Sequence, residues 1–425
     1  MTTAYSSSRR KALKGLAALA TIQIVPRNVI GKGVTPPSEE LTRCIIGCGG
    51  ISASHLGMPG RLLALCDVDS KHLATRMGQV QKKGNKDVKG YGDFREVLAR
   101  KDIDIVHVAT PPHWHAYMSI AAAKSGKDVW CEKPMSRTIG EGIEMVKAME
   151  KYERIFRLNT WFRFRGGFYG MGTTVAPIRK AMMNNMFGGP VTLTVGAHQG
   201  FNWKFNWVGK TDLKEQPVPE HFNYDMWLGP APKKPYHPHR THRTFRGYWD
   251  YDGGGLGDMG QHYLDPVQYI LGKDDESPVE VMIDADPQDL EAVGKWRRIE
   301  YTYADGTKII LDGDGREKGM PYIKGPEGSL SKGFKSDIKG FEEKLKALPE
   351  PAPQITDFHQ AVRERKKFAL NEKNGFRSAT IVNLGTIAHR SNKSFKFDPK
   401  TFTIDEPEAN KLIHQVSRKE WELPS

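Results

Sequence analysis

Cysteine is scarce in this sequence, and no apolar run reaches the length that a membrane-spanning helix needs. Four cysteines occur in 425 residues, within or beside apolar segments and without a C-x-x-C pair; they are Cys44, Cys48, Cys66 and Cys131. We therefore expect buried thiols rather than a disulfide framework or a zinc centre. Because a spanning helix needs about 20 consecutive apolar residues, we also expect no stable membrane insertion.

The sequence also lacks a basic stripe of the kind that binds nucleic acid. Its 63 lysines and arginines exceed the 50 acidic residues and give a net charge of +13. This positive charge is dispersed along the chain, and no nucleic-acid-binding motif accompanies it. We interpret it as solvated lysine faces and expect no nucleic-acid partner.

The first residues, 1–33, have the layout of an export signal. Ser8-Arg9-Arg10-Lys11-Ala12-Leu13-Lys14 precedes a mild apolar run over Gly15–Val25, and it resembles a twin-arginine signal with Ala12 where phenylalanine is usual. A disordered basic tail is the alternative interpretation, and it would leave the protein in the cytoplasm. The export interpretation predicts a periplasmic protein that folds around its cofactor before transport and therefore holds it tightly.

Residues 41–161 predict a doubly wound parallel sheet. Short apolar runs that read as strands alternate with helical stretches; the strand candidates are Cys44–Ile46, Leu62–Cys66, Ile103–Ala109 and Asp128–Cys131, and the helix candidates are Phe94–Arg100, His115–Ser125 and Gly140–Lys151. This alternation is typical of βαβ units. The predicted fold class is therefore α/β at the N-terminal end.

Residues 162–425 predict an α+β domain with a large, mostly antiparallel open sheet. Apolar and polar side chains alternate along four segments, namely Val191–Ala197, Val279–Ala285, Arg298–Tyr303 and Lys308–Leu311, and Asp305-Gly306 is a hairpin signal between the last two. An aromatic and proline-rich excursion over Phe201–Asp252 interrupts the pattern, and loops of this length are usually functional. The stretch Thr356–His389 predicts two helices that return to the first domain.

A glycine-rich turn follows the first predicted strand. Gly47-Cys48-Gly49-Gly50-Ile51-Ser52 can bring backbone N–H groups up to a pyrophosphate at the start of a helix, as in a Rossmann nucleotide site. Asp67 ends the second strand, where a carboxylate binds ribose hydroxyls and repels the extra phosphate of NADP. The sequence therefore predicts NAD as the cofactor, in preference to NADP.

Two further motifs predict proton-handling residues. Lys133, in Glu132-Lys133-Pro134, closes the fourth strand at the sheet edge where ligands bind. Asp258 and His262 follow a triple glycine and are four residues apart, so that on a helix both can reach one substrate carbinol. A histidine can take the hydroxyl proton as hydride leaves carbon, with the carboxylate orienting it. The alternatives are a solvated lysine, a helix N-cap at Asp258 and a core histidine at His262.

The combination resembles the glucose-fructose oxidoreductase/inositol dehydrogenase family, often written Gfo/Idh/MocA. The matching segments are the Gly47–Gly50 turn with Asp67, Thr110-Pro111-Pro112-His113-Trp114-His115, Glu132-Lys133-Pro134 and the Asp258/His262 pair. The resemblance implies that Lys133, Asp258 and His262 are catalytic. The implied cofactor contacts are Gly47, Gly49, Gly50, Ile51, Asp67, Thr110, Pro111, His115, Glu132 and Lys133. Departures occur at Ser52 and at Asn159-Thr160-Trp161.

Aromatic side chains crowd the excursion and favour a carbohydrate substrate, because aromatic faces pack against the C–H faces of sugar rings. We expect substrate contacts from Trp161, Arg163, Trp249, Tyr251 and His262. An aromatic core or a subunit interface is the alternative use of these rings. His237-Pro238-His239-Arg240-Thr241-His242 has irregular spacing, so we expect no metal site there or elsewhere. The open sheet would suit a homo-oligomer, a dimer or tetramer, as in the family.

An exported enzyme that released NADH would stall, since free NAD is scarce outside the cytoplasm. We therefore expect a redox-neutral cycle on a sugar or glycoside, with a 3-keto-glycoside as the product of the oxidising half. An NAD-dependent glycosidase or epimerase that acts through transient oxidation is the alternative. A non-catalytic protein that binds sugar and nucleotide is a further alternative.

Overall fold

The computed structural model describes residues 40–160, 162–164 and 166–424. Residues from Leu41 onward form one compact unit. The expected export segment, residues 1–33, and the expected substrate residue Trp161 lie outside the described residues. Within them, no helix is both long enough and apolar enough to cross a bilayer.

The first sheet is six-stranded, with the order β3-β2-β1-β4-β5-β6 and parallel pairing throughout. Its strands are β1 (Thr42–Ile46), β2 (Arg61–Cys66), β3 (Lys89–Tyr91), β4 (Ile105–Val108), β5 (Asp128–Glu132) and β6 (Phe156–Asn159). Every residue of β4 and β5 is buried, as a strand covered by helices on both faces requires. The predicted doubly wound sheet is confirmed, and its strand order reverses between β1 and β4.

Five helices accompany this sheet, and side-chain caps fix where three of them begin. They are α2 (Ser52–His55), α3 (Ser70–Lys82), α4 (Phe94–Leu98), α5 (His115–Lys124) and α6 (Ile139–Lys151). Asp69 caps α3, Asp93 caps α4, and Thr138 forms a capping box with Glu141 at α6. All four cysteines are buried free thiols, as expected.

The second sheet has nine strands in the order β13-β12-β11-β7-β10-β9-β8-β14-β15. Its strands are β7 (Thr192–Gly196), β8 (Glu280–Ala285), β9 (Trp296–Thr302), β10 (Lys308–Asp312), β11 (Ile323–Gly325), β12 (Gly328–Ser331), β13 (Lys335–Ser336), β14 (Phe395–Asp398) and β15 (Thr403–Ile404). Only β7 and β10 pair in parallel, because the long excursion returns the chain to the same end. The prediction of a mostly antiparallel sheet is therefore confirmed.

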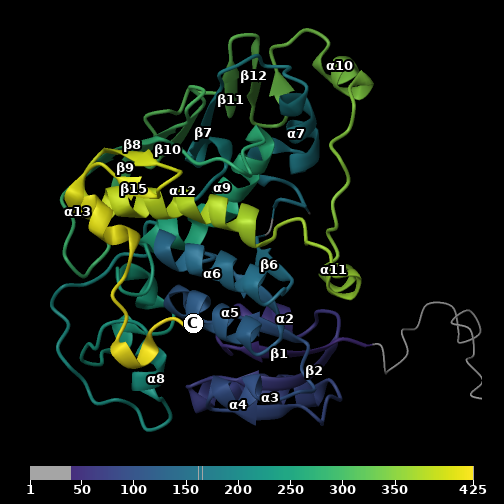
Figure 1. Cartoon of the computed structure of the whole chain (residues 1–425). Helices are drawn as coiled ribbons and strands as arrows, with labels where there is room; N and C mark the ends of the chain where they lie inside the picture. Colours follow the sequence, from purple (N-terminus) through teal and green to yellow (C-terminus); the bar gives the residue numbers. More distant parts are fainter. Residues whose placement is uncertain (1–39, 161, 165, 425) are drawn as a thin grey trace, which may run out of the picture. The chain divides into compact units, whose positions relative to one another are not determined.

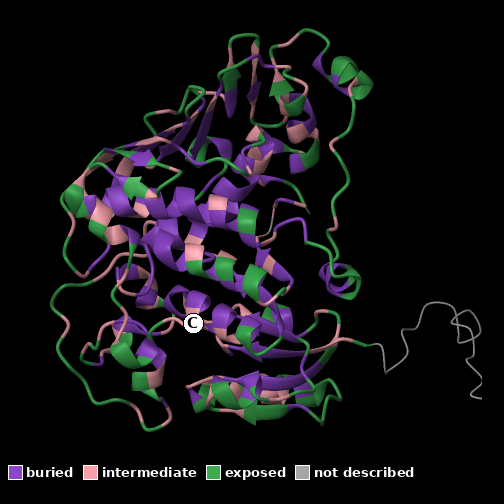
Figure 2. Ribbon diagram, viewed as in Figure 1, coloured by how far each residue is buried: buried purple, intermediate pink, exposed green. Residues whose placement is uncertain are grey.

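Two long helices cover one face of this sheet and join it to the first. α9 (Gly254–Leu271) and α12 (Glu372–Ser391) pack against each other, and α12 also packs against α6 and β8 (Figure 1). Most residues of α12 are buried, which Figure 2 shows as a nearly continuous purple helix. The remaining helices are α7 (Val175–Met183), α8 (Tyr224–Leu228), α10 (Phe341–Ala347), α11 (Phe358–Glu364) and α13 (Pro407–Asn410).

The excursion between β7 and α9 folds back onto the first sheet. Its aromatic side chains build a small core of their own, made of Phe222, Tyr224, Trp227, Leu228, Ala231, Tyr236, Phe245, Tyr248 and Tyr251. Backbone hydrogen bonds join it to the end of β2, from Ser70 N to His221 O and from Asn223 N to Val68 O. The indole N–H of Trp114 donates to Trp227 O, 2.8 Å away. Most of these rings are therefore structural.

Candidate active site

A cavity of about 620 Å³ lies where the carboxyl ends of β1, β2 and β4 meet the excursion. This is the edge where doubly wound sheets bind nucleotides, at the reversal of strand order. The predicted cofactor residues that line it are Gly47, Gly49, Gly50, Ile51, Asp67, Thr110 and Pro111. Its volume lies in the usual range for a cofactor site.

The glycine turn leaves bare backbone facing the cavity. Gly47 has φ +96°, and a Cβ there would lie 2.5 Å from Ala109 O, so only glycine fits. A Cβ on Gly49 or Gly50 would meet nothing within 4 Å, which leaves room for a pyrophosphate. The following helix, α2, is only four residues long. Binding by this turn therefore rests on its N–H groups more than on a helix dipole.

The Asp67 carboxylate is hydrogen-bonded to the glycine turn. Its Oδ2 accepts the Cys48 N–H at 2.6 Å, and its Oδ1 accepts the Asp69 N–H at 2.8 Å. Burial raises the pKa of Asp67, and these two N–H groups oppose that shift. Each oxygen keeps a lone pair for a ribose hydroxyl. The donor set and the bare turn fit a bound NAD.

Three predicted cofactor residues, Glu132, His115 and Lys133, are not among the described residues that line the cavity. Glu132 is buried, and its Oε1 lies 2.6 Å from His55 Nε2 and 2.7 Å from Asn159 Nδ2. His115 bridges Thr110 O at 2.9 Å and Pro134 O at 2.6 Å. Burial lowers the pKa of His115, so a neutral ring donates only one of these bonds.

The sequence did not identify the residues that close the cavity from the excursion. They include Trp207, Trp227, His242, Arg243 and Arg246, and Arg76 on α3 joins them. The Arg76 guanidinium donates to Ser52 Oγ at 2.8 Å and to Gly49 O at 2.6 Å, which places a positive charge beside the glycine turn. Only the fold brings these distant segments together, so no local pattern could have identified them.

Lys133 and Asp258 meet behind the part of the cavity wall that Trp207 and Arg246 form, which we call its inner end, and neither of the two lines the cavity itself. Lys133 Nζ lies 3.0 Å from Asp258 Oδ1 and also donates to Asp258 O. The carboxylate forms an ion pair with Arg246, whose Nε lies 2.8 Å from Oδ1, and accepts a hydrogen bond from Trp207 Nε1 at 3.1 Å. Both of those residues line the cavity. The residues that we expected to converge, one from each sheet region, are therefore in contact.

The charges of this cluster set the protonation of its members. Burial alone would raise the pKa of Asp258, but Lys133 and Arg246 outweigh it and hold that pKa below its usual value. His262 lies on the same face of α9, one turn on. Burial lowers its pKa well below the ordinary value, the positive charge of Lys133 adds to this, and Asp258 opposes it. This direction favours the neutral form of the His262 ring.

The carboxylate of Asp258 contacts Lys133, Arg246 and Trp207. That it also orients His262 stays a prediction. The two cations attract the carboxylate more strongly than a neutral imidazole does. Asp258 therefore orients the ammonium.

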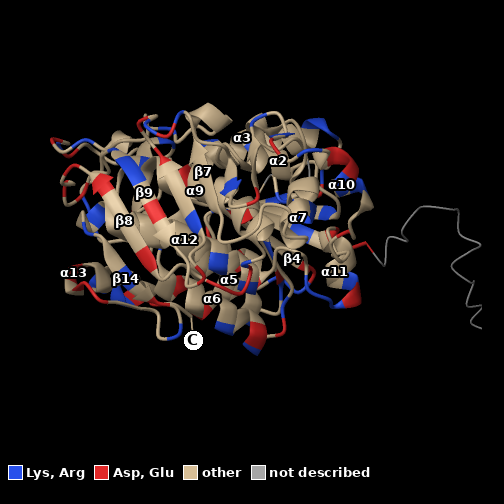
Figure 3. Ribbon diagram, turned by 90° about the horizontal axis from the view of Figure 1, so that it is seen from above, with Lys and Arg blue, Asp and Glu red and all other residues tan. Residues whose placement is uncertain are grey.

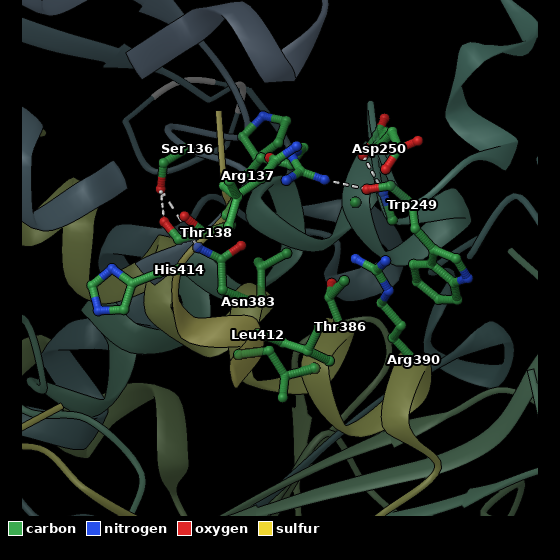
Figure 4. Close-up of a pocket in the computed structure, with 18 of the residues that line it drawn as sticks. Ser136, Arg137, Thr138, Trp249, Asp250, Asn383, Thr386, Arg390, Leu412 and His414 are labelled. Atoms are coloured by element: carbon green, nitrogen blue, oxygen red, sulfur yellow. Dashed lines mark hydrogen bonds between the residues drawn. The ribbon is translucent and has the colours of Figure 1, made fainter. Parts of the chain in front are cut away.

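A second cavity of about 260 Å³ lies behind the cluster, lined by the start of α6, by α12 and by the C-terminal segment (Figure 4). Arg137 donates to Trp249 O at its rim, and Arg390 lies beside the Trp249 ring. Asp252 also lines it. Burial raises the pKa of Asp252 to about 7, and the nearby charge of Asp258 adds to this.

The expected substrate residues are scattered. Trp249 lines the second cavity, and Tyr251 belongs to the aromatic core of the excursion. Arg163 is fully buried, and its donors are used by Asp265 and Asp274. Among the described members of this set, His262 alone is placed beside Lys133 and Asp258. We therefore assign Arg163 and Tyr251 to packing rather than to the substrate.

Comparisons with known proteins agree with this arrangement. Two family models match the chain, one described as "Oxidoreductase family, NAD-binding Rossmann fold" over residues 42–160 and one as "Oxidoreductase family, C-terminal alpha/beta domain" over residues 171–423. A "Glycosyl hydrolase family 109 protein" of Saccharopolyspora erythraea is 35% identical over 132 residues. That match covers 29% of this chain and 29% of the relative, so it spans less than a third of either.

Two solved structures share the fold at low identity. The WlbA dehydrogenase from Bordetella pertussis, in complex with NADH and UDP-GlcNAcA, is 16% identical with a TM-score of 0.56, over 84% of this chain and 98% of that one. The aldose-aldose oxidoreductase from Caulobacter crescentus, complexed with glycerol, is 18% identical with a TM-score of 0.52, over 84% of this chain and 100% of that one.

Proposed function

The chain belongs to the Gfo/Idh/MocA family and is an NAD-binding oxidoreductase, and we propose that it oxidises a hydroxyl-bearing carbon of a sugar or glycoside. The observation that carries this is the contact of 3.0 Å between Lys133 Nζ and Asp258 Oδ1 at the inner end of the nucleotide cavity. A carbohydrate substrate is supported by the relative and the two solved structures described above, which are a glycosyl hydrolase, a dehydrogenase in complex with UDP-GlcNAcA and an aldose-aldose oxidoreductase.

The charges of the site residues indicate which role each of them has in the reaction. The glycine turn and Asp67 would hold NAD, which would supply a hydride acceptor for the substrate carbon and, once reduced, a hydride donor for a second sugar, so that no free nucleotide would be consumed. The ammonium of Lys133 stabilises the developing alkoxide, and neutral His262 receives the hydroxyl proton. Asp258 holds the ammonium in place, and Arg246 pairs with the same carboxylate. The Trp207 ring, whose N–H donates to Asp258, offers a face to the sugar.

We propose a 3-keto-glycoside as the product of the oxidising half, in a periplasmic enzyme that retains its nucleotide. Purified protein should carry NAD(H), and an added glycoside should change the absorbance at the reduced-cofactor band. Protein that neither carries nor binds nicotinamide would contradict the proposal. So would a spectrum that no glycoside changes.

The glycosyl hydrolase family 109 relative favours a second candidate, net hydrolysis through transient oxidation. Oxidation at C3 acidifies the neighbouring C–H and prepares the glycosidic bond for elimination. Product analysis by mass separates the two. Simple oxidation lowers the mass of the intact glycoside by two hydrogens, whereas hydrolysis releases the free sugar.

A further inference from the structure

A cluster of histidines around one carboxylate lies at the edge of the nucleotide cavity, apart from the catalytic residues. Asp69 follows β2, His72 is in the first turn of α3, and His242 comes from the excursion. One donor atom from each of the three lies within 4.8 Å of the others. The His72 and His242 rings are 4.6 Å apart, centroid to centroid.

The two carboxylate oxygens of Asp69 make different contacts. Oδ1 caps α3 by accepting the N–H groups of Lys71 and His72, at 2.9 and 3.3 Å. Oδ2 faces the imidazoles, 3.4 Å from His242 Nε2 and 3.8 Å from His221 Nε2. The carboxylate is buried, with 4% of its side chain exposed. Asp69 is therefore fixed by the helix and directs Oδ2 at His242 and His221.

One of these distances already has the spacing of ligands around a small divalent cation, and the longer ones would have to shorten by an ångström or so. Ligands of a tetrahedral zinc, at about 2.0–2.1 Å from the metal, are about 3.3–3.4 Å from one another. The contact between His242 Nε2 and Asp69 Oδ2 already has that length. Imidazole nitrogens with one carboxylate are ligands that zinc accepts and magnesium does not prefer.

We propose that Asp69, His72 and His242 form a zinc-binding site, with His221 as the fourth ligand. The sequence led us to expect no metal site, because His242 lies in an irregular histidine run and its partners are far away in the chain. The bound ion fastens the excursion to the start of α3. Since His72 and His242 also line the nucleotide cavity, this fastening slows the release of NAD. That consequence rests on nucleotide binding, whereas the metal site itself does not.

The test begins with full-length protein dialysed against a chelator and titrated with Zn²⁺ in competition with a chromophoric chelator. We expect one tight equivalent per chain, no comparable binding of Mg²⁺, and slower release of bound NAD in the zinc form. Asp69→Asn keeps the helix cap, and His242→Ala removes a ligand from the excursion. Each should weaken zinc binding by more than about 100-fold, the upper end of losses seen when only a supporting partner of a ligand is removed.

His198→Ala is the matched control, because His198 is exposed and lies outside the cluster. It should leave zinc affinity unchanged, and thermal unfolding of all three variants should show that they fold. The site is overturned if the wild-type protein binds no tight equivalent, or if Asp69→Asn and His242→Ala bind zinc as the wild type does. An unchanged rate of NAD release with zinc bound overturns the fastening role. None of these readouts uses a sugar, so a failure of the proposed function would be seen separately.

Discussion

Lys133 pairs with Asp258 and is not among the described residues that line the nucleotide cavity, so its replacement separates catalysis from binding. Lys133→Met should lower turnover of a glycoside by about 10²–10⁴-fold, because the alkoxide loses its stabilising charge. Nucleotide content, measured after denaturation of the purified variant, should stay near that of the wild type. Lys101→Met, at an exposed lysine, should keep full turnover. If the protein only binds sugar and nucleotide, the wild type and both variants will show no turnover, and the prediction is contradicted.

The raised pKa of Asp252 predicts that the stability of the protein depends on pH. Its pKa is raised to about 7 by burial, from an ordinary value of 3.8. Folded protein therefore keeps the proton up to about pH 7, whereas unfolded protein releases it near pH 4. The free energy of unfolding should fall as pH rises through that window, by at most about 1.4 kcal/mol for each pH unit.

Asp252→Asn tests this sign, because asparagine keeps an acceptor for the Gly253 N–H without a charge. The melting temperature of the variant relative to wild type should rise from pH 5 to pH 8. A difference that does not change with pH would mean that Asp252 is ionised throughout.

At the scale of elements, the triple glycine is explained by the start of α9. A Cβ on Gly255 would lie 1.7 Å from Trp203 O, so the helix packs its backbone directly on the excursion. Gly255→Ala should cost about 1–3 kcal/mol of unfolding free energy, measured by denaturant titration. A Cβ on Gly319 would meet nothing within 4 Å, so the unfolding free energy of Gly319→Ala should stay within about 0.5 kcal/mol of the wild-type value. Equal stability of the two variants would contradict this packing.

The parallel strands, the glycine turn and the mostly antiparallel sheet could be predicted from sequence, because periodicity and turn residues are local signals. The contact between Lys133 and Asp258 could be expected only through the family resemblance. The role of Arg246 could not, since it depends on how the excursion folds over the cavity. Glu132 was assigned to the cofactor through the family resemblance and Arg163 was expected to contact the substrate, yet buried partners hold each of them.

At the scale of the whole molecule, the charges on the open sheet are mutually paired. Arg297 pairs with Asp284, and Glu300 pairs with Arg298 and Lys308, so blue and red alternate across β8 and β9 in Figure 3. These ion pairs leave no positive patch among the described residues of this face, in agreement with the expectation that the excess positive charge is dispersed along the chain. They also leave the face suited to another protein surface rather than to an anionic polymer.

We propose that this face forms a homo-oligomer. Met282 is 48% exposed there and pairs across the sheet with Glu300, so Met282→Lys should disturb association more than the fold. Light scattering after size exclusion should give a multiple of the chain mass for wild type and a smaller mass for the variant. Leu290→Lys, at an exposed leucine outside the strands, should leave the mass unchanged. A monomeric wild type would contradict the proposal.

An experimental structure of the protein with NAD and a glycoside tests the central claim most directly. We predict the nicotinamide at the inner end of the cavity, with the substrate carbon about 3–3.5 Å from its C4 and the hydroxyl within hydrogen-bond reach of Lys133 or His262. A nicotinamide at the Asp67 end, or a sugar held away from Lys133, Asp258 and His262, would contradict it.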